Sequence, residues 1–498
     1  SKIFQIIFNK FWIMISFLFA FLFRVTQSVI LVEDIPPLPE RTTVPGTLDA
    51  YVNKEFTQIP ESPSVINASN GLQIQAGTNN VNQISGCTFT DITNTQRIYY
   101  IKAVSEFLFY NNTFKNSQYS ATEGSGIMWI NYVGKMTISN CRFINIVGRG
   151  GDGHIFNVNS QQKVELTLEN CEFTDCGKSN GRALINMLQA ECSVKFYDCN
   201  ITFNNIDNAC RVIDLKSYIA TFERCRFKQC GANAIYLGYT NNLSPTPSEE
   251  VTFTFKNNYV TGCNKGQFIL APMLKSKANI EGNEFDSITL DNSIMISTTH
   301  DRSEIEISRN TFSNIKTSST SGGVGINIIN SNEECTIRYY KCIFNNNGAL
   351  SSHGGALSFG YSNNNYANIE IIECKFHGNE ATGGHGGAVA IRTSKSVTIR
   401  DCRFESNIAN RQDDSSGSKG FGGGIYISTS FESNDAQCMS NLSITDCHFR
   451  NNQAYQGYGI HIQSTTTSCE PTITLNYNQF NNDHETETHP SKGGIISS

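Results

Sequence analysis

The stretch "ECKFHGNEATGGHGGAVAI", Glu373 to Ile391, places His385 between glycines and decides the fold because it recurs. The segment "YKCIFNNNGALSSHGGALSF", Tyr340 to Phe359, puts His353 at the same place relative to a Cys-x-Phe sequence. A histidine bracketed by glycines suggests a catalytic or metal-binding role. Its recurrence shows that it belongs first of all to a repeat.

The repeat covers most of the chain. Aligning the sequence on a Cys or Asn that stands two residues before an aromatic residue or Val gives fourteen anchors, with a mean spacing of about 30 residues (391/13). The anchors are Cys87, Asn112, Cys141, Cys171, Cys199, Cys225, Asn258, Asn283, Asn310, Cys342, Cys374, Cys402, Cys447 and Asn478. The copy at Cys199 continues as "NITF", and we interpret it as carrying an insertion. Three residues before every anchor stands an apolar or aromatic residue: Ile84, Phe109, Ile138, Leu168, Phe196, Phe222, Phe255, Ile280, Ile307, Tyr339, Ile371, Ile399, Ile444 and Leu475.

Each repeat contains short alternating strands such as "MTISN" and "IEISR", separated by Gly, Asn and Ser turns, and no helical segment long enough to be a crossover. Strands that recur in this way must stack on their equivalents in the next repeat, with one coil per repeat. The sequence therefore predicts an all-β fold, a single-stranded parallel β-helix (solenoid) of about 14 coils. At a strand spacing of about 4.8 Å, the first and last anchors would lie roughly 60 Å apart.

The anchor column has a structural explanation. In stacked coils each column is a ladder of like side chains, so an inward Asn can bond to the Asn above and below it, and Cys fills the same small space. Nine of the seventeen cysteines are anchors. This placement indicates packing rather than catalysis.

Composition narrows the function classes. The net charge is -6 and only 16% of the residues are charged, without a basic stripe, so we expect no nucleic-acid partner. The 39 glycines and 32 phenylalanines suit a β-rich chain with many turns, because Gly adopts positive φ and Phe fills pleated faces.

The first residues are typical of an export signal. Lys2 and Lys10 precede thirteen uncharged residues, Phe11 to Phe23, a run that is short for a membrane span. We predict a signal peptide over 1–28, with an uncleaved signal anchor as the alternative, a Pro-containing linker and N-terminal cap over 29–80, and the β-helix over 81–498, with sequence missing at both ends. The protein is then secreted or on the cell surface, and touches a membrane only through its N-terminal segment or the missing sequence.

Paired motifs mark the last third of the chain: "FNNN" at Phe344 with "GGAL" at Gly354, "FHGN" at Phe376 with "GGAV" at Gly386, and "FESN" at Phe404 with "GGGI" at Gly422. In these motifs the chain resembles polymorphic outer membrane proteins, whose repeats pair Phe-x-x-Asn with Gly-Gly-Ala-[Ile/Leu/Val]. The resemblance is good from about Cys335 onward. It implies a right-handed β-helix of the pectin-lyase-like superfamily on a cell surface, with a role in adhesion.

The histidine column reads His353, His385, Phe421, Gln456 and Lys492 over five coils. Polygalacturonases share the superfamily fold and use a Gly-His-Gly with paired aspartates earlier in the chain, but the adjacent pair here, Asp413-Asp414, follows His385. Two stacked imidazoles are also fewer than the three or four ligands of a functional zinc site. We therefore expect solvated turn residues, no catalytic residue, no metal site and no cofactor.

Carboxylates give no stronger signal. Glu249-Glu250 follows "SPTPS" in an expected loop, and Glu333-Glu334 is expected in a turn. A β-helix lyase would need several carboxylates on neighbouring coils to hold Ca²⁺, and a base nearby. The sequence indicates acidic turns instead of such a ladder.

The other cysteines are candidates for disulfides, because an exported chain meets an oxidising compartment. Cys438 and Cys469 lie at equivalent positions nine residues before their anchors, and Cys230 and Cys263 lie five residues after theirs. Equivalent positions one coil apart are within disulfide range. We predict both disulfides.

Asn-x-Ser/Thr sequons occur at Asn67, Asn111, Asn200, Asn242 and Asn441. Alternation along the strands points Asn111, Asn200 and Asn441 outward, where they could carry glycans if the source is eukaryotic.

Two function classes remain open. The first is a non-enzymatic surface module for adhesion or recognition, whose partner is an unidentified surface protein or glycan. The second is a polysaccharide lyase or glycoside hydrolase that acts on an acidic polysaccharide. Function depends on the site and not on the scaffold, so the fold does not choose between them.

Overall fold

Every anchor follows a sharp corner of the backbone. The residue before each of the fourteen anchors has a positive φ, for example Asn170 at 50° and Glu373 at 54°. A second corner of this kind lies four residues after most anchors, as at Asn346 (52°). Left-handed residues turn the chain abruptly, so the four residues between two such corners run straight, and the last three of them form a short strand. The coils are built from such strands and corners.

The computed structural model describes residues 55–56, 66–67 and 71–75, residues 81–481 apart from loops of which the longest are 120–126, 238–251, 319–325, 410–419, 430–438 and 464–470, and residues 496–497. They belong to one compact unit, Leu48–Ser498. None of the described residues forms a helix long and apolar enough to cross a membrane. The predicted signal segment 1–28 lies outside the described residues.

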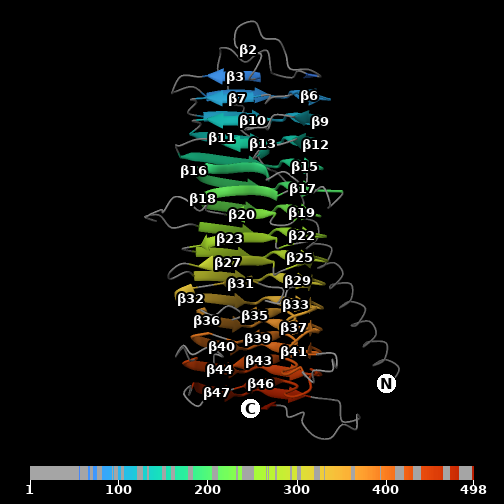
Figure 1. Ribbon diagram of the computed structural model, residues 1–498, viewed down its shortest axis with the longest axis vertical. Coiled ribbons are helices and arrows are strands. Elements are labelled where there is room, and N and C mark those ends of the chain that lie inside the picture. Colours follow the sequence, from blue (N-terminus) through green and yellow to red (C-terminus); the bar gives the residue numbers. More distant parts are fainter. Residues whose placement is uncertain are drawn as a thin grey trace, which may run out of the picture. The chain divides into compact units, whose positions relative to one another are not determined.

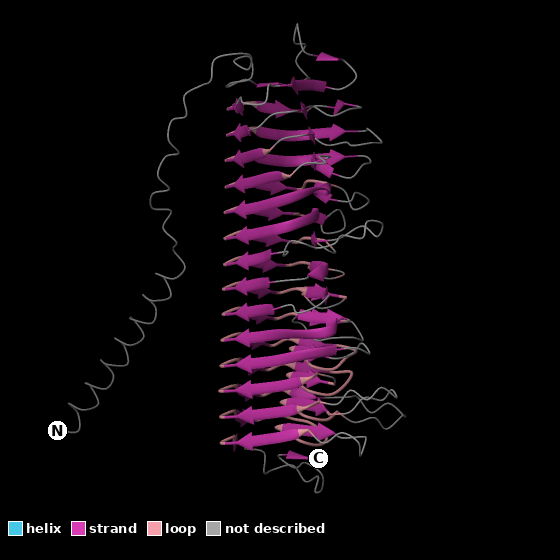
Figure 2. Cartoon of the chain, turned by 90° about the vertical axis from the view of Figure 1, so that its left-hand side faces the viewer, coloured by secondary structure: helices cyan, strands magenta, loops and turns pink. Residues whose placement is uncertain are grey.

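The described strands form four sheets, A to D, in which every strand except β2 pairs in parallel with a strand one repeat away (Figures 1 and 2). Sheet A contains β1 (Glu55–Phe56), β5 (Thr88–Thr90), β6 (Thr93–Asn94), β9 (Thr113–Tyr119), β12 (Arg142–Gly148), β15 (Glu172–Thr174), β17 (Asn200–Thr202), β19 (Arg226–Lys228), β22 (Tyr259–Thr261), β25 (Glu284–Asp286), β29 (Thr311–Ser313), β33 (Ile343–Asn345), β37 (Lys375–His377), β41 (Arg403–Glu405), β45 (His448–Arg450) and β48 (Gln479–Asn481).

Sheet B lies on the other side of the core and contains β2 (Ile66–Asn67), β3 (Gly71–Gln75), β4 (Val81–Ser85), β7 (Tyr99–Lys102), β8 (Glu106–Tyr110), β10 (Met128–Asn131), β11 (Lys135–Ser139), β13 (Gly153–Val158), β14 (Val164–Glu169), β16 (Ala183–Tyr197), β18 (Arg211–Glu223), β20 (Ile235–Leu237), β21 (Thr252–Lys256), β23 (Ile269–Leu274), β24 (Lys277–Glu281), β27 (Met295–Thr299), β28 (Glu304–Ser308), β31 (Ile326–Ile329), β32 (Ser331–Tyr340), β36 (Asn365–Ile372), β40 (Ser396–Arg400), β44 (Asn441–Thr445) and β47 (Thr472–Asn476). Only the pair β2 and β3 is antiparallel among the described pairings.

Two smaller sheets complete the C-terminal coils. Sheet C contains β26 (Thr289–Leu290), β30 (Lys316–Thr317), β34 (Gly348–Ala349), β38 (Glu380–Ala381) and β42 (Ile408–Ala409). Sheet D contains β35 (Leu357–Phe359), β39 (Val389–Ile391), β43 (Ile425–Ser428), β46 (Ile460–Gln463) and β49 (Ile496–Ser497).

The register confirms the predicted all-β, parallel solenoid. Ile138 pairs with Leu168, and Leu168 with Phe196, so the apolar residues three positions before the anchors stack in one column. The coil count differs somewhat from the expected fourteen. The continuous path through sheet A has fifteen strands, because β1 pairs with β5 ahead of the first anchor.

The aromatic column of sheet A forms the centre of the core. Phe376 is buried, and its ring lies 4.9 Å from that of Phe344 and 4.8 Å from that of Phe404, with nearly parallel planes. The expected insertion after Cys199 is wrong. Ile201 pairs in register with Phe173 and Phe227, and so fills the aromatic position itself.

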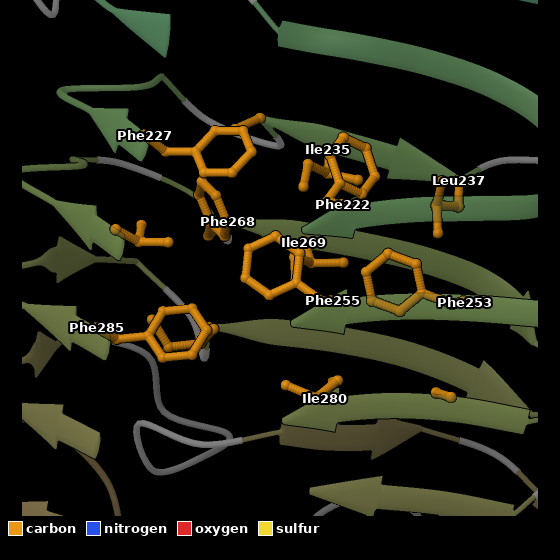
Figure 3. Close-up of a cluster of buried hydrophobic side chains, with 14 of the residues drawn as sticks. Phe222, Phe227, Ile235, Leu237, Phe253, Phe255, Phe268, Ile269, Ile280 and Phe285 are labelled. Atoms are coloured by element: carbon orange, nitrogen blue, oxygen red, sulfur yellow. The ribbon is translucent and has the colours of Figure 1, made fainter. Parts of the chain in front are cut away.

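Val260 occupies the same column between Phe227 and Phe285 and is smaller than a phenylalanine. The ring of Phe268, from the opposite side of the coil, lies 5.3 Å from the Phe227 ring and 6.5 Å from the Phe285 ring. Figure 3 shows Phe268 between these two rings. A side chain from another strand therefore fills the gap, as close packing of the core requires.

Candidate binding surface

The anchor ladder consists of interchangeable Asn and Cys side chains. The backbone amide of Asn258 donates to Oδ1 of Asn283, and the side-chain Nδ2 of Asn283 donates to the backbone carbonyl oxygen of Phe255. The amide of Cys374 likewise donates to Sγ of Cys402, whose thiol donates to the carbonyl oxygen of Ile371. A thiol can replace a carboxamide here because both side chains accept one bond and donate another. The anchors thus serve the core, as the sequence predicts.

A second ladder, which sequence reasoning missed, explains the Phe-x-x-Asn motif. Its members are Asn347, Asn379, Asn407 and Asn452, all buried. Oδ1 of each accepts the backbone amide of the residue one coil before it, as between Asn407 and Asn452 at 3.0 Å. The signal available was the strict spacing of Asn three residues after Phe, on the side of the turn that faces the core.

The Gly-Gly-Ala motif is explained by backbone contact between coils. Gly386 has a φ of +70°, and a Cβ on Gly387 would lie 2.2 Å from the carbonyl oxygen of Gly423. The first glycine supplies the left-handed turn and the second allows the close approach. Neither glycine requires a ligand to account for it.

The histidine column is packed more tightly than expected. His353 and His385 are half-buried, and their ring centroids lie 4.8 Å apart. The Phe421 ring lies 4.8 Å beyond His385, with His461 4.7 Å from Phe421, while Tyr426 covers His385 at 4.6 Å. We call these five residues the imidazole–aromatic stack. The prediction of turn residues is confirmed, but these residues are half-buried and not solvated, because rings from β43 and β46 pack against the turns.

The two imidazoles have defined hydrogen-bonding roles. The amide of His385 donates to Nδ1 of His353 at 2.8 Å, and the amide of Phe421 donates to Nδ1 of His385 at 3.1 Å. A neutral imidazole accepts only at its unprotonated nitrogen, so the proton sits on Nε2 of both rings. Binding a metal through Nε2 would require the proton to move to Nδ1 and break these bonds.

Other acidic candidates are not brought together. Among the described residues, no group of three or more His, Cys, Asp and Glu side chains is placed to hold a metal ion. Glu333 and Glu334 lie in β32 and not in the expected turn. Glu249-Glu250, Asp413-Asp414 and Lys492 lie outside the described residues.

The outer face of sheet A carries an excess of cations. We define it by the 28 residues that flank the inward central residue of the fourteen strands aligned with the anchors, from β5 to β48. Seven of them are Lys or Arg (Lys115, Arg142, Arg226, Lys228, Lys375, Arg403 and Arg450) and four are acidic (Glu172, Glu284, Asp286 and Glu405). This face is therefore +3 (7 − 4) on a chain of net charge -6.

Most of these cations are not neutralised. Arg142 pairs with Glu172 at 2.8 Å, and Arg450 with Glu405 at 3.7 Å. The other five, Lys115, Arg226, Lys228, Lys375 and Arg403, form no ion pair with any described residue. On sheet B, by contrast, cations are paired along neighbouring coils, as Arg338 is with Glu370 at 2.6 Å.

A shallow hollow of about 370 Å³ lies on this face over β15, β17, β19 and β22. Its lining includes the short side chains of Asn200 and Thr202 together with Arg226, Lys228 and Tyr259. Hydroxyl groups, an aromatic ring and unpaired cations thus converge on one concave surface. Such a lining can bind hydroxylated and anionic groups together.

Cys230 and Cys263 are buried at equivalent positions, each two residues after its strand ends, β19 and β22 respectively. Cys263 has a free thiol that donates to the carbonyl oxygen of Thr261. The disulfide between them stays a prediction. Cys438 and Cys469 lie outside the described residues, so their disulfide also stays a prediction.

The sequons at Asn111, Asn200 and Asn441 are exposed, as alternation predicts. Asn67 lies in β2, and Asn242 lies outside the described residues. Attachment of glycans at any of the five stays a prediction.

Comparison with known families gives one match. The model described as the right handed beta helix region matches residues 100–246 and 356–498, which together are more than half of the chain. No curated protein matches the chain.

Proposed function

Because the chain belongs to the right-handed β-helix family, we propose that it is an exported surface module that recognises an anionic glycan or glycosylated partner without transforming it. Export is part of this proposal and is supported by the apolar segment Phe11 to Phe23 behind Lys2 and Lys10. The resemblance of the last third to polymorphic outer membrane proteins supports a place on the cell surface.

The observation that carries the proposal is the set of unpaired cations on the outer face of sheet A. Arg226 and Lys228 point into the hollow from one strand and have no described carboxylate to neutralise them. An anion placed there gains charge-assisted hydrogen bonds without first breaking a salt bridge. Lys375 and Arg403 repeat the arrangement on neighbouring strands farther along the same face. A polymer with repeated acidic groups would contact several of these positions at once, so weak single contacts would add up.

The lining favours binding over catalysis. Glu172, the carboxylate of the hollow, is engaged by Arg142 at 2.8 Å and by the hydroxyl of Thr174 at 3.1 Å. A lyase needs a base that is free to take a proton, and a hydrolase needs a pair of carboxylates. The alternative of a lyase or hydrolase on an acidic polysaccharide is retained as an outcome of the test.

The test is binding of the purified chain to immobilised pectate, polygalacturonate and glycosaminoglycans, with and without Ca²⁺, together with a measurement of chain length of the polymers. The double variant Arg226→Ala/Lys228→Ala should lose at least about tenfold in affinity, the loss expected for two charge-assisted contacts. The matched control Lys135→Ala/Arg338→Ala removes the same charge from sheet B and should bind like the wild type. Equal losses in both variants would contradict the assignment of the face. Depolymerisation abolished by a single Asp, Glu or His substitution would establish the enzymatic alternative.

A further inference from the structure

We propose that the imidazole–aromatic stack is an acid-sensitive clasp, which holds the Gly-Gly turns of the C-terminal coils together when neutral and releases them when protonated. The stack connects three successive turns through His353, His385 and Phe421, and connects them to β43 and β46 through Tyr426 and His461. It is separate from sheet A and so does not depend on the function proposed for that face.

The pH sensitivity arises because each imidazole accepts its hydrogen bond at the nitrogen that becomes protonated in acid. His353 and His385 both accept a backbone amide at Nδ1, which is the only nitrogen of the Nε2–H tautomer that can take up a proton. Protonation adds a hydrogen to Nδ1, so that the nitrogen becomes a donor facing the N–H group of His385 or Phe421. Each proton taken up therefore removes one hydrogen bond between coils.

Charge adds to this effect. Two protonated rings with centroids 4.8 Å apart repel each other, and half-burial reduces the screening by water. His385 is in ring contact with two other titratable side chains, His353 from the preceding turn and Tyr426 from β43, and His461 of β46 lies 5.7 Å from the Tyr426 ring. β38 approaches the same turns through the backbone of Glu380, beside Gly355. Arg392 follows β39 at the end of that strand away from the turn.

The same coils contain a matched structure that does not titrate. Backbone amides of Asn347 and Asn379 donate to Oδ1 of Asn379 and Asn407, and a carboxamide takes up no proton in this pH range. Acid should therefore loosen the Gly-Gly turns, while the hydrogen bonds of Asn347, Asn379 and Asn407 in the same coils stay intact. A general acid unfolding would loosen both.

The test is amide hydrogen exchange of the full chain at about pH 7.5 and about pH 5, expressed as protection factors. On acidification the protection of the His385 and Phe421 amides should fall at least about tenfold, which corresponds to one pKa unit of coupling. The Asn347 and Asn379 amides should keep their protection. Constant protection of Phe421, or an equal fall at all four amides, overturns the proposal.

Three variants separate the clasp from ordinary packing. His385→Gln keeps an acceptor oxygen but cannot be protonated. In this variant the acid-induced fall in protection should disappear at the Phe421 backbone amide. It should persist at the backbone amide of residue 385, which still donates to Nδ1 of His353. His353→Gln should give the reverse pattern. His385→Phe keeps a ring, as Phe421 does one coil later, but has no acceptor, and should leave the Phe421 amide poorly protected at both pH values. If His385→Gln retains the wild-type pH response at Phe421, the switch is not at His385.

Discussion

Asn379 is joined to Asn407 twice: its backbone amide and its side-chain Nδ2 donate to the same Oδ1 atom, at 3.0 and 2.9 Å. Nδ2 of Asn379 also donates to the carbonyl oxygen of Phe344. Both residues are fully buried. The corner of each C-terminal coil is therefore closed by a side chain that replaces the missing backbone partner, which buried polar groups require.

Replacing Asn379 should be costly for this reason. In Asn379→Ala the backbone amide of Asn347 and the backbone carbonyl oxygen of Phe344 lose their hydrogen-bond partners inside the core. Each buried unsatisfied group costs about 1–3 kcal/mol. We expect the free energy of unfolding to fall by about 3 kcal/mol in denaturant melts. Asn379→Cys should lose clearly less, because Cys230 and Cys263 occupy the equivalent position in other coils. Asn345→Ala, on the outer face, is the control and should change stability by under about 0.5 kcal/mol. Similar losses at positions 345 and 379 would contradict the ladder.

The core ring of the same coil gives a second prediction. Phe376 is 1% exposed and stacks between Phe344 and Phe404, so Phe376→Ala should cost about 3 to 5 kcal/mol, the usual range for a buried Phe. The neighbouring Lys375→Ala, on the outer face, should have little effect. A small loss for Phe376→Ala would mean that the column is not the core.

The sequence predicted the parallel coils, the apolar column and the anchor ladder because these follow from one repeated pattern of side chains. It did not predict Phe268 filling the space beside Val260, because that contact joins different strands of the coil and has no fixed spacing. The packing of Tyr426 on His385 was missed for the same reason. His385→Ala should therefore cost about 1 to 2 kcal/mol, from one hydrogen bond and the ring contacts. The charge of sheet A became visible only when the register had defined which residues share its outer face.

His461 should make stability depend on pH. It is 6% exposed, and burial lowers its pKa below the ordinary value of 6.5. The unfolded chain therefore binds more protons than the folded one as the pH falls below about 6.5, so the stability contributed by neutral His461 is present above that pH and is lost on acidification through the folded pKa. His461→Phe should flatten this part of the curve of unfolding free energy against pH. Ile460→Val is the control, because it weakens the adjacent core without removing a titratable group. A wild-type slope in His461→Phe would show that other groups cause the acid loss.

The last prediction concerns the thiols. Burial raises the pKa of Cys176 from 9.0 to about 12 and raises the pKa of Cys374 and Cys402 well above the ordinary value. A rise of three pKa units lowers the thiolate fraction about 1000-fold, and the thiolate is the reactive form. Native protein at about pH 8 should therefore leave these three cysteines unlabelled by iodoacetamide on a time scale that labels a free exposed thiol, and denaturation should make them reactive.

The same labelled samples test the disulfides. Cys402 uses its sulfur both to accept the amide of Cys374 and to donate to the carbonyl oxygen of Ile371, and a disulfide between Cys374 and Cys402 would remove the donating hydrogens. Non-reducing peptide mapping of protein folded under oxidising conditions should therefore find the anchor cysteines as single thiols and Cys438 linked to Cys469. Labelling of the latter pair should require prior reduction. A cross-link between Cys374 and Cys402 would show that the anchor column is a disulfide framework, because the hydrogen bonds of the ladder and a bond between its sulfurs exclude each other.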